Sequence, residues 1–448
     1  MISINKDTYI PSVEETLGIL NVHNQHLPQF IDFDKVVQYL SFMAMKNKQI
    51  EGPLFEMLKY SNGMTASLDN VLKTWLVNSG NASGFKSVKT GISLAKDSVE
   101  AAIESGRLSD EAKVIIGAWQ QYNNNKKTMR TLEGLLQHDI SNAYSFDNHR
   151  MLIVRPTWSA QNTGRVAMSN PAIQNLPRTV QDIITVPKGY TLLHTDSGQI
   201  EPRTVYSAYI KDPQIQTLIK LYNDAYFGVL HYITMPESDI ASGRLDFTPM
   251  EITDEMKENR KRLKTYSNAV MYGSTSNSSA DPIKDAMIKR IGGHPLRQAW
   301  VRNLNEQIAR GVRKFPTAFG TLIDISNSQK LDRIDSEYFD GSLDNKAYSD
   351  TVSYELTKLA INNPIQGTAA DLMRVSVSKA NALLMQKAKK SYIINYVHDA
   401  GTFAIHDDDY DKIADELADI VHYEVEGWVP ILAEPEFGRS GGMFADLY

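Results

Sequence analysis

The chain contains no cysteine. Disulfide bonds, zinc–thiolate sites and thiol catalysis are therefore excluded, and we expect a protein of the reducing cytoplasm. There is also no apolar run near the roughly eighteen residues that a membrane-spanning helix needs. The first residues, Met1-Ile2-Ser3-Ile4-Asn5-Lys6-Asp7, lack the basic flank and apolar core of a signal peptide. We expect no membrane partner.

The chain also lacks an excess of positive charge, since its formal net charge is −6. Net charge is a poor guide to nucleic-acid binding when basic residues cluster. Five cations fall within residues 257–264, and more follow between residues 284 and 314. Acidic residues gather elsewhere, as in residues 407–409. These local clusters keep nucleic acid open as a partner.

With 448 residues the chain is too long for one core and should divide into subdomains. Apolar residues at three- and four-residue spacing predict helices over 68–76 and 110–136. Short apolar runs with turns follow over 150–205, and 206–345 is again helical and basic. From 350 onward we expect a long helix, a hairpin and a helix near 410–426. The simplest architecture is an α+β protein, in which a discontinuous sheet domain carries two helical insertions.

Two aspartates lie at the edges of predicted strands. Asp196 closely follows the apolar run 190–193, and Asp399 lies in a tight turn between the runs 393–397 and 402–405. A sheet could bring the two carboxylates together. Paired carboxylates hold two Mg²⁺ ions, which suit in-line displacement at phosphorus. An Asp after a strand more often only ends it, so the surrounding sequence has to decide.

One predicted helix carries a polar stripe. Arg260, Lys264, Asn268 and Tyr272 recur every four residues, with Thr253 as a plausible N-cap and Gly273 as a stop. Two cations one turn apart can grip a polyphosphate, and a Tyr two turns further can offer its ring to a base. Taken alone, the stripe is better explained as the solvated face of a basic helix with a buried Tyr.

Two further segments are informative. In segment 362–373, Asn362 and Gln366 are uncharged polar groups able to reach base edges in a minor groove. Pro364 suits the first turn of a helix. The Gly and Ala positions of the segment indicate tight core packing. The other, 163–177, combines Thr-Gly-Arg with a Pro-rich stretch that alone would be an ordinary loop.

In order and spacing these segments resemble the motif set of family-A DNA polymerases, the bacterial DNA polymerase I type, over about residues 60–448. Segment 163–177 resembles the primer-strand motif, 196–203 the first metal motif, 260–273 the nucleotide-binding helix, and 362–371 with 397–399 the final motifs. The resemblance implies a right-hand polymerase fold with an antiparallel-sheet palm and mostly helical thumb and fingers. Its expected parts are an N-terminal segment (1–60), thumb (61–145), palm (146–205 and 346–448) and fingers (206–345).

The resemblance implies a role for each matching position. Asp196 and Asp399, helped by the carbonyl of Ser197, would hold two Mg²⁺ ions, for which Mn²⁺ can substitute. Lys264 would protonate the pyrophosphate leaving group, and Glu201 would fill the space that a ribose 2′-OH needs. The remaining expected contacts to the nucleotide are Arg260, Lys264, Asn268, Tyr272, Gln199 and His398. The expected contacts to DNA are Arg165, Gln174, Asn175, Lys358, Asn362, Gln366, Lys126, Lys127 and Arg130.

Four positions depart from the family pattern. Asn268 stands where an aromatic ring usually packs on the incoming sugar, Ala400 where Glu usually follows the second Asp, Lys358 in place of Arg, and Pro202 in place of Leu. The metal pair is intact. Asn268 either hydrogen-bonds the nucleotide or leaves a looser pocket, and the looser pocket is favoured because one amide rarely replaces the contact area of a ring.

The expected activity is template-directed DNA synthesis on a primer 3′-OH, from dNTPs, on a primer–template DNA. Some sixty residues before the thumb cannot hold a 3′–5′ exonuclease, so we expect proofreading from another chain. A separate exonuclease, a helicase or a single-strand binding protein would be a further partner. The compact form is phage-like, which would place the protein in the host cytoplasm. Two alternatives stay open: a single-subunit RNA polymerase and an inactive polymerase-like DNA-binding protein. Ala400 leans slightly towards the RNA polymerase, whereas residues 199–201 and 366–371 lean strongly away from it.

Overall fold

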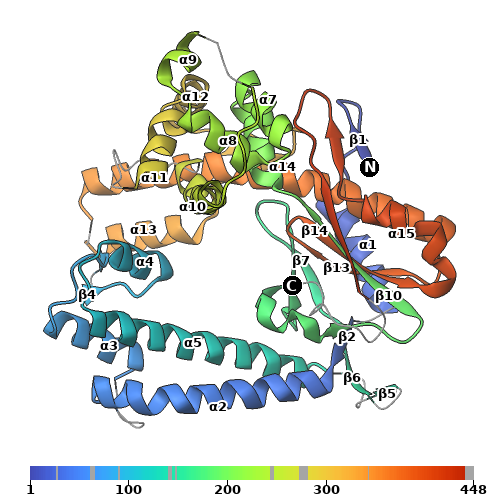
Figure 1. Ribbon diagram of the computed structural model, residues 1–448, viewed down its shortest axis with the longest axis horizontal. Coiled ribbons are helices and arrows are strands. Elements are labelled where there is room, and N and C mark those ends of the chain that lie inside the picture. The colour runs from blue at the N-terminus through green and yellow to red at the C-terminus, as the bar shows by residue number, and fades with distance from the viewer. Residues whose placement is uncertain are drawn as a thin grey trace. The chain divides into compact units, whose positions relative to one another are not determined.

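A computed structural model describes residues 1–26, 29–60, 66–88, 91–139, 144–146, 149–242, 247–271, 281–341 and 343–438. The chain divides into two compact units. The first contains 1–29, 155–169 and 186–448, and the second contains 30–154 and 170–185. Helices and antiparallel sheets occur in both units (Figure 1), which confirms the predicted α+β class.

The first unit is built on a four-stranded antiparallel sheet. Its order is β13 (Tyr392–Val397), β14 (Ala400–His406), β10 (Tyr190–Ser197) and β16 (Ala433–Gly438). Strands β13 and β14 form the predicted hairpin, and its two-residue turn is His398-Asp399. In the register of β10 and β14, Asp196 lies opposite Ala400. The sheet therefore brings the two aspartates to neighbouring positions.

Side-chain alternation decides which way Asp196 faces. The hydroxyl of Thr195 donates to the Ala418 carbonyl at 2.7 Å, and that of Ser197 donates to the Val421 carbonyl at 3.0 Å. Both side chains therefore point toward α15 (Tyr410–Ala418) and the segment after it, where α15 packs on β10, β14 and β16 (Figure 1). Because successive strand side chains point to opposite faces, Asp196 faces away from α15.

The long helix α14 (Asn345–Lys387) crosses the whole unit. Asp344 caps its start by accepting from the Ala347 N–H at 2.8 Å. The expectation that Pro364 begins a helix is wrong, because Pro364 lies in the interior of α14. A proline removes one main-chain hydrogen bond there, but most residues of 360–377 are buried, and tertiary packing holds the helix through it.

The helix predicted near 410–426 is also shorter than expected. Helix α15 ends at Ala418, and the chain then forms β15 (Tyr423–Val425), which pairs in parallel with β1 (Ile2–Ile4). The partner strand comes from the other end of the sequence. A local pattern of apolar residues cannot show such a pairing, and the predicted helix therefore runs past the observed end of α15.

The helical insertion of the first unit follows β10. Its members are α6 (Ile200–Thr204), a π-helical turn (Val205–Tyr209), α7 (Pro213–Tyr222), α8 (Ala225–Thr234), α9 (Glu237–Ser242), α10 (Asp254–Met271), α11 (Pro282–Met287), a second π-helical turn (Ile288–Gly292), α12 (Pro295–Ala309) and α13 (Gln329–Phe339). Aspartates cap α7, α8 and α11, and buried Ile215, Leu218 and Leu263 belong to its core. The small hairpin β11 (Lys314–Pro316)–β12 (Leu322–Asp324) was not predicted.

Two more short elements of this unit bear on the site. Helix α1 (Val13–His26) packs on α14 and β13, and the hairpin β7 (Thr157–Ala160)–β8 (Val166–Ser169) packs on α1 through β7. The turn of this hairpin carries Gly164 with φ +76°, and a Cβ there would lie 2.8 Å from the Arg374 guanidinium. Both the backbone conformation and the close approach require glycine.

The second unit is dominated by α2 (Phe33–Leu58) and α5 (Asp110–Gln137), which lie side by side (Figure 1). With α3 (Leu68–Asn78) they confirm the helices predicted over 68–76 and 110–136. Helix α4 (Lys96–Glu104) and the pair β3 (Ser87–Val88)–β4 (Gly91–Ile92) complete one end. A sheet of order β5 (Tyr144–Phe146), β6 (His149–Val154), β2 (Gln29–Asp32) and β9 (Ile184–Thr185) forms the rest.

Candidate active site

The structure places Asp196 and Asp399 side by side at the end of the sheet. The N–H of Ser197 donates to the carbonyl oxygen of Asp399 at 2.9 Å. Asp399 follows His398, whose φ of 54° makes the tight turn between β13 and β14. Both carboxylates are partly buried. Two motifs distant in sequence thus form one acidic centre.

The electrostatics of this centre are unfavourable without a cation. Burial and, secondly, the charge of Asp196 raise the pKa of Asp399 to about 7, while Arg165 acts in the opposite direction. Like charges that repel in a low-dielectric site favour protonation or a bound cation. The two carboxylates therefore fit a hard dication such as Mg²⁺.

Within the described residues no group of three or more His, Asp or Glu side chains could hold a metal ion. This arrangement suits Mg²⁺, which proteins usually bind through one or two carboxylates together with substrate phosphates. The metal would be held by Asp196, Asp399 and the main-chain carbonyl of Ser197, with further ligands from water and substrate.

Glu201, in the first turn of α6, forms an ion pair with Arg165 from the β7–β8 turn. The two side chains keep 21% and 12% of their surface exposed. Partial burial and then Arg165 lower the pKa of His398, whereas Glu201 acts to raise it. Because Arg165 and Glu201 also affect the pKa of Asp399, these side chains lie near the two aspartates.

Gln199 connects this acidic centre to α8. Its backbone is left-handed, with φ 58°. Its amide oxygen accepts from the Ala225 N–H at 2.6 Å, and its amide nitrogen donates to the Asp224 carboxylate at 2.7 Å. A Cβ on the preceding Gly198 would lie 2.5 Å from the Glu434 carboxylate, so the exposed Glu434 side chain would have to move to admit one.

Helix α10 carries the predicted cationic stripe. Its cap is as expected, since the Thr253 hydroxyl accepts from the Met256 N–H at 3.2 Å. Lys264 is exposed, and Arg260, one turn earlier, forms an ion pair with Asp224 at 2.5 Å. The side chain of Asn268 and the whole of Tyr272 and Gly273 lie outside the described residues.

On α14, Lys358, Asn362 and Gln366 share one face at four-residue spacing. Asn362 and Gln366 are only half-buried within a run of buried residues, and they are joined by a hydrogen bond of 3.1 Å. A Cβ on Gly367 would lie 2.8 Å from Thr317, so the tight packing expected at this glycine is present. Lys358 pairs with Glu355 of its own helix at 3.3 Å.

The other residues expected to contact DNA belong to the second unit. Lys126, Lys127 and Arg130 lie on α5, where the ammonium of Lys126 sits 4.9 Å from the centre of the Tyr122 ring. Gln174 and Asn175 lie in a 3₁₀ turn (Ile173–Asn175).

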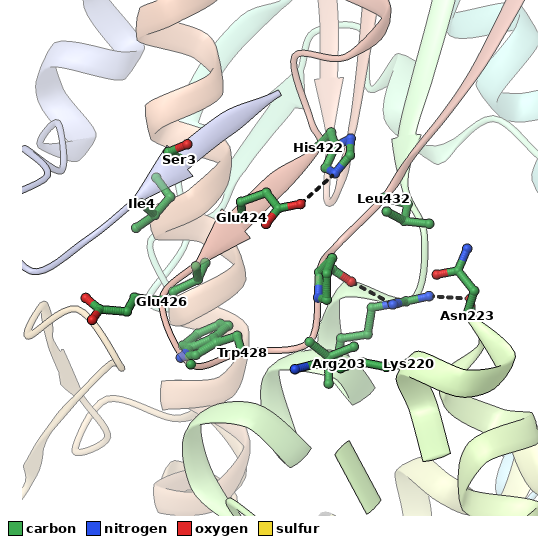
Figure 2. Close-up of a pocket in the computed structure, with 14 residues that line it drawn as sticks. Ser3, Ile4, Arg203, Lys220, Asn223, His422, Glu424, Glu426, Trp428 and Leu432 are labelled. Atoms are coloured by element: carbon green, nitrogen blue, oxygen red, sulfur yellow. Dashed lines mark hydrogen bonds and ion pairs between the residues drawn. The ribbon is translucent and has the colours of Figure 1, made fainter. Parts of the chain in front are cut away.

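A cavity of about 750 Å³ lies elsewhere in the first unit, and the two aspartates do not line it. It is bordered by β1, by β15 and by the segment 426–432 that follows β15 (Figure 2). Carboxylates such as Glu424 and Glu426 alternate there with cations such as Arg203 and Lys220, so its charge favours no single class of ligand. Arg203 acts structurally, because its guanidinium donates to the carbonyls of Pro430 and Asn223, each at 2.6 Å.

Three residues beside the site were missed by reasoning from sequence. Asp224 contacts both Gln199 and Arg260. Burial raises the pKa of Tyr226 to about 12, with Glu201, Arg260 and Asp399 among the neighbouring charges that affect it. Glu434 lies opposite Asp196 in the register of β10 and β16. Of these three, only Asp224 has a signal in the sequence. It precedes an apolar helix, which marks it as a helix cap and not as a site residue.

The fold is that of known polymerases. The structure is similar to the polymerase domain of Pol1 from M. smegmatis, solved in complex with DNA primer-template and dNTP, with a TM-score of 0.71 and 19% identity. The similarity covers 95% of this chain and 70% of that one. The right-hand polymerase fold predicted from the motifs is therefore confirmed.

Residues 38–442 match the family model of DNA polymerase family A, and the chain belongs to this family. DNA polymerase I of Aquifex aeolicus is 28% identical over 237 residues, which are 53% of this chain and 36% of that protein. DNA polymerase I of Mycobacterium tuberculosis is 25% identical over 327 residues, 69% of this chain and 31% of that protein. The matched region thus spans about a third of these relatives. Among the described helices, none has the length and apolar character needed to cross a membrane.

Proposed function

We propose that this chain catalyses template-directed DNA synthesis, adding deoxynucleotides to the 3′-OH of a primer. The observation that carries the proposal is the convergence of Asp196 and Asp399 beside Glu201 and Arg165 in a chain of DNA polymerase family A. The solved polymerase domain with a similar fold was captured with primer-template and dNTP, and those ligands are the substrates proposed here.

In this proposal the primer 3′-oxygen attacks the α-phosphorus of the dNTP, a new P–O bond forms, and the bond to the β-phosphate oxygen breaks to release pyrophosphate. Two Mg²⁺ ions held by Asp196 and Asp399 would stabilise the charge on the attacking and leaving oxygens. Arg260 and Lys264 bind the triphosphate, and Lys264 supplies a proton to the pyrophosphate.

The chain's other residues have proposed roles in orientation and selection. Glu201 occupies the space of a ribose 2′-OH and excludes ribonucleotides. Asn362 and Gln366 follow the minor groove near the primer end, together with Arg165. The residues 61–145 act as the thumb, with Lys126, Lys127 and Arg130 on the duplex, and 206–345 act as the fingers. We expect this chain to extend primers without removing their 3′ ends.

Primer extension tests the proposal. A labelled primer annealed to a longer template is incubated with the protein and either dNTPs or NTPs, in Mg²⁺, Mn²⁺ or EDTA. Extension with dNTPs that requires a divalent cation supports DNA synthesis. Preference for NTPs would favour the RNA polymerase alternative, and DNA binding without extension would favour an inactive DNA-binding protein. A 3′-labelled primer without nucleotides tests excision in the same series.

A further inference from the structure

Asp224 lies where three parts of the candidate active site meet. Its Oδ2 accepts from the side-chain amide of Gln199 at 2.7 Å. The same oxygen accepts from Nε and Nη2 of Arg260, at 3.1 and 2.5 Å. Its Oδ1 caps α8 by accepting from the Phe227 N–H at 2.8 Å. One carboxylate therefore joins the segment after Asp196 to the helix that carries the triphosphate-binding cations.

The contacts use only one edge of the Arg260 guanidinium. An arginine has five N–H donors in a rigid planar fork, and Asp224 engages the Nε and Nη2 side of it. The Nη1–Nη2 edge is left for a bidentate contact with phosphate. The guanidinium also lies 5.4 and 5.3 Å from the ring centres of Tyr226 and Phe227. With 28% of its side chain exposed, Arg260 is oriented but accessible.

Asp224 is itself held rigidly. The carbonyl of the preceding Asn223 accepts a 2.6 Å hydrogen bond from Arg203, a buried residue with 2% of its surface exposed. The same guanidinium reaches Asn223 in one direction and a main-chain carbonyl in the other (Figure 2). Burial alone would raise the pKa of Asp224, but hydrogen bonds from Arg260 and from the helix start lower it below the usual value. The carboxylate is therefore ionised at neutral pH.

We propose that Asp224 is a positioning residue that orients Arg260 for bidentate contact with the triphosphate of the incoming nucleotide, an inference that rests on the proposed function. A carboxylate beside a polyphosphate repels it, so a residue that merely neutralised Arg260 would weaken binding. A residue that fixes the guanidinium strengthens binding, because less side-chain entropy is lost when the phosphate arrives. The two roles predict opposite effects when the charge of Asp224 is removed.

Asp224→Asn tests this directly, since Asn caps helices about as well as Asp. Asp224→Ser keeps a capping oxygen on a shorter side chain and serves as the second variant. The matched control is Asp212→Asn. Asp212 caps α7 in the same way, by accepting from the Gln214 and Ile215 N–H groups at 2.8 and 2.9 Å, and its side-chain partner is the His294 ring at 3.1 Å. Steady-state primer extension then gives KM for dNTP and kcat for each variant.

We expect Asp224→Asn and Asp224→Ser to raise KM for dNTP about tenfold with little change in kcat, as for a loss of uniform binding. Asp212→Asn should keep the parent KM. In an Arg260→Ala background, Asp224→Asn should change KM less than about twofold, because coupled residues are not additive. A lower KM, a KM equal to that of the Asp212→Asn control, or an effect that persists without Arg260 would each overturn the proposal.

A binding measurement separates this inference from the proposed function. The probe is inorganic triphosphate with Mg²⁺, titrated into the full chain and followed by calorimetry. If the parent extends primers but Asp224→Asn binds triphosphate as tightly as the parent, the inference is wrong and the function stands. If the parent does not extend primers, weaker triphosphate binding by Asp224→Asn than by Asp212→Asn still supports the role of Asp224.

Discussion

The main-chain N–H of Ser197 donates to the carbonyl oxygen of Asp399 at 2.9 Å. This hydrogen bond continues the pairing of β10 with β14 into the β13–β14 turn, just beyond the register pair Asp196–Ala400. It holds together the main chain of two motifs that are far apart in sequence. The relative position of the two carboxylates is therefore set by the sheet and not by a flexible loop.

Removing either carboxylate should abolish synthesis while preserving DNA binding. Asp196→Ala or Asp399→Ala should slow primer extension by about a thousandfold or more, roughly 4 kcal/mol of barrier. DNA affinity should change little because phosphate contacts elsewhere dominate it. Asp408→Asn is the control, since Asp408 lies just after β14 but is 62% exposed and pairs with Lys390. An Asp399→Ala protein that retained about a tenth of the parent rate would contradict the metal assignment.

The raised pKa of Asp399 predicts how stability depends on pH. The folded carboxyl holds its proton up to about pH 7, whereas the unfolded one loses it near about pH 4. The folded state therefore binds more protons in this window, and its free energy of unfolding falls as pH rises through it. In EDTA, the melting temperature of the parent relative to Asp399→Asn should decrease from about pH 4 to about pH 7. Mg²⁺ should oppose this decrease, because a dication favours the charged carboxylates. Parallel curves for the two proteins would show that Asp399 is not perturbed.

Local patterns were sufficient to predict several parts of the molecule. The turn that holds Asp399, the helices α3 and α5, and the Thr253 cap of α10 each depend on a few neighbouring residues. The nearness of Asp196 and Asp399 was inferred from strand edges, but only the sheet order fixes it.

What could not be predicted depends on distant partners. The strand β15 exists because β1 pairs with it, and Pro364 stays helical because packing encloses α14. The role of Asp224 is hidden for another reason. Aspartates cap α2, α7, α11 and α14 as well, and only the fold shows which of these aspartates meets Arg260.

A buried ion pair on α14 should be essential for stability. Asp371 and Arg374 have 0% and 4% of their side chains exposed, and Arg374 also donates to the Pro11 carbonyl at 2.7 Å. Asp371→Ala leaves a buried cation without its partner, which typically costs about 3–5 kcal/mol. We expect a large fall in melting temperature by calorimetry. Lys387→Ala breaks the exposed pair with Glu416 and should cost at most about 1 kcal/mol. Equal falls in melting temperature in the two variants would show that the buried pair stabilises the fold no more than the exposed pair does.

Glu201 should determine which sugar the enzyme accepts. Glu201 is held by Arg165 with 21% of its side chain exposed, so a ribose 2′-OH would meet a fixed carboxylate and not a mobile one. Glu201→Ala should therefore raise the use of ribonucleotides relative to deoxynucleotides by at least about tenfold, or roughly 1.4 kcal/mol. The measurement is kcat/KM for one dNTP and the matching NTP on the same primer–template. Glu426→Ala, an exposed carboxylate on the 750 Å³ cavity, should leave the ratio unchanged. If Glu201→Ala lowers both values in proportion, the carboxylate supports nucleotide binding in general and does not select the sugar.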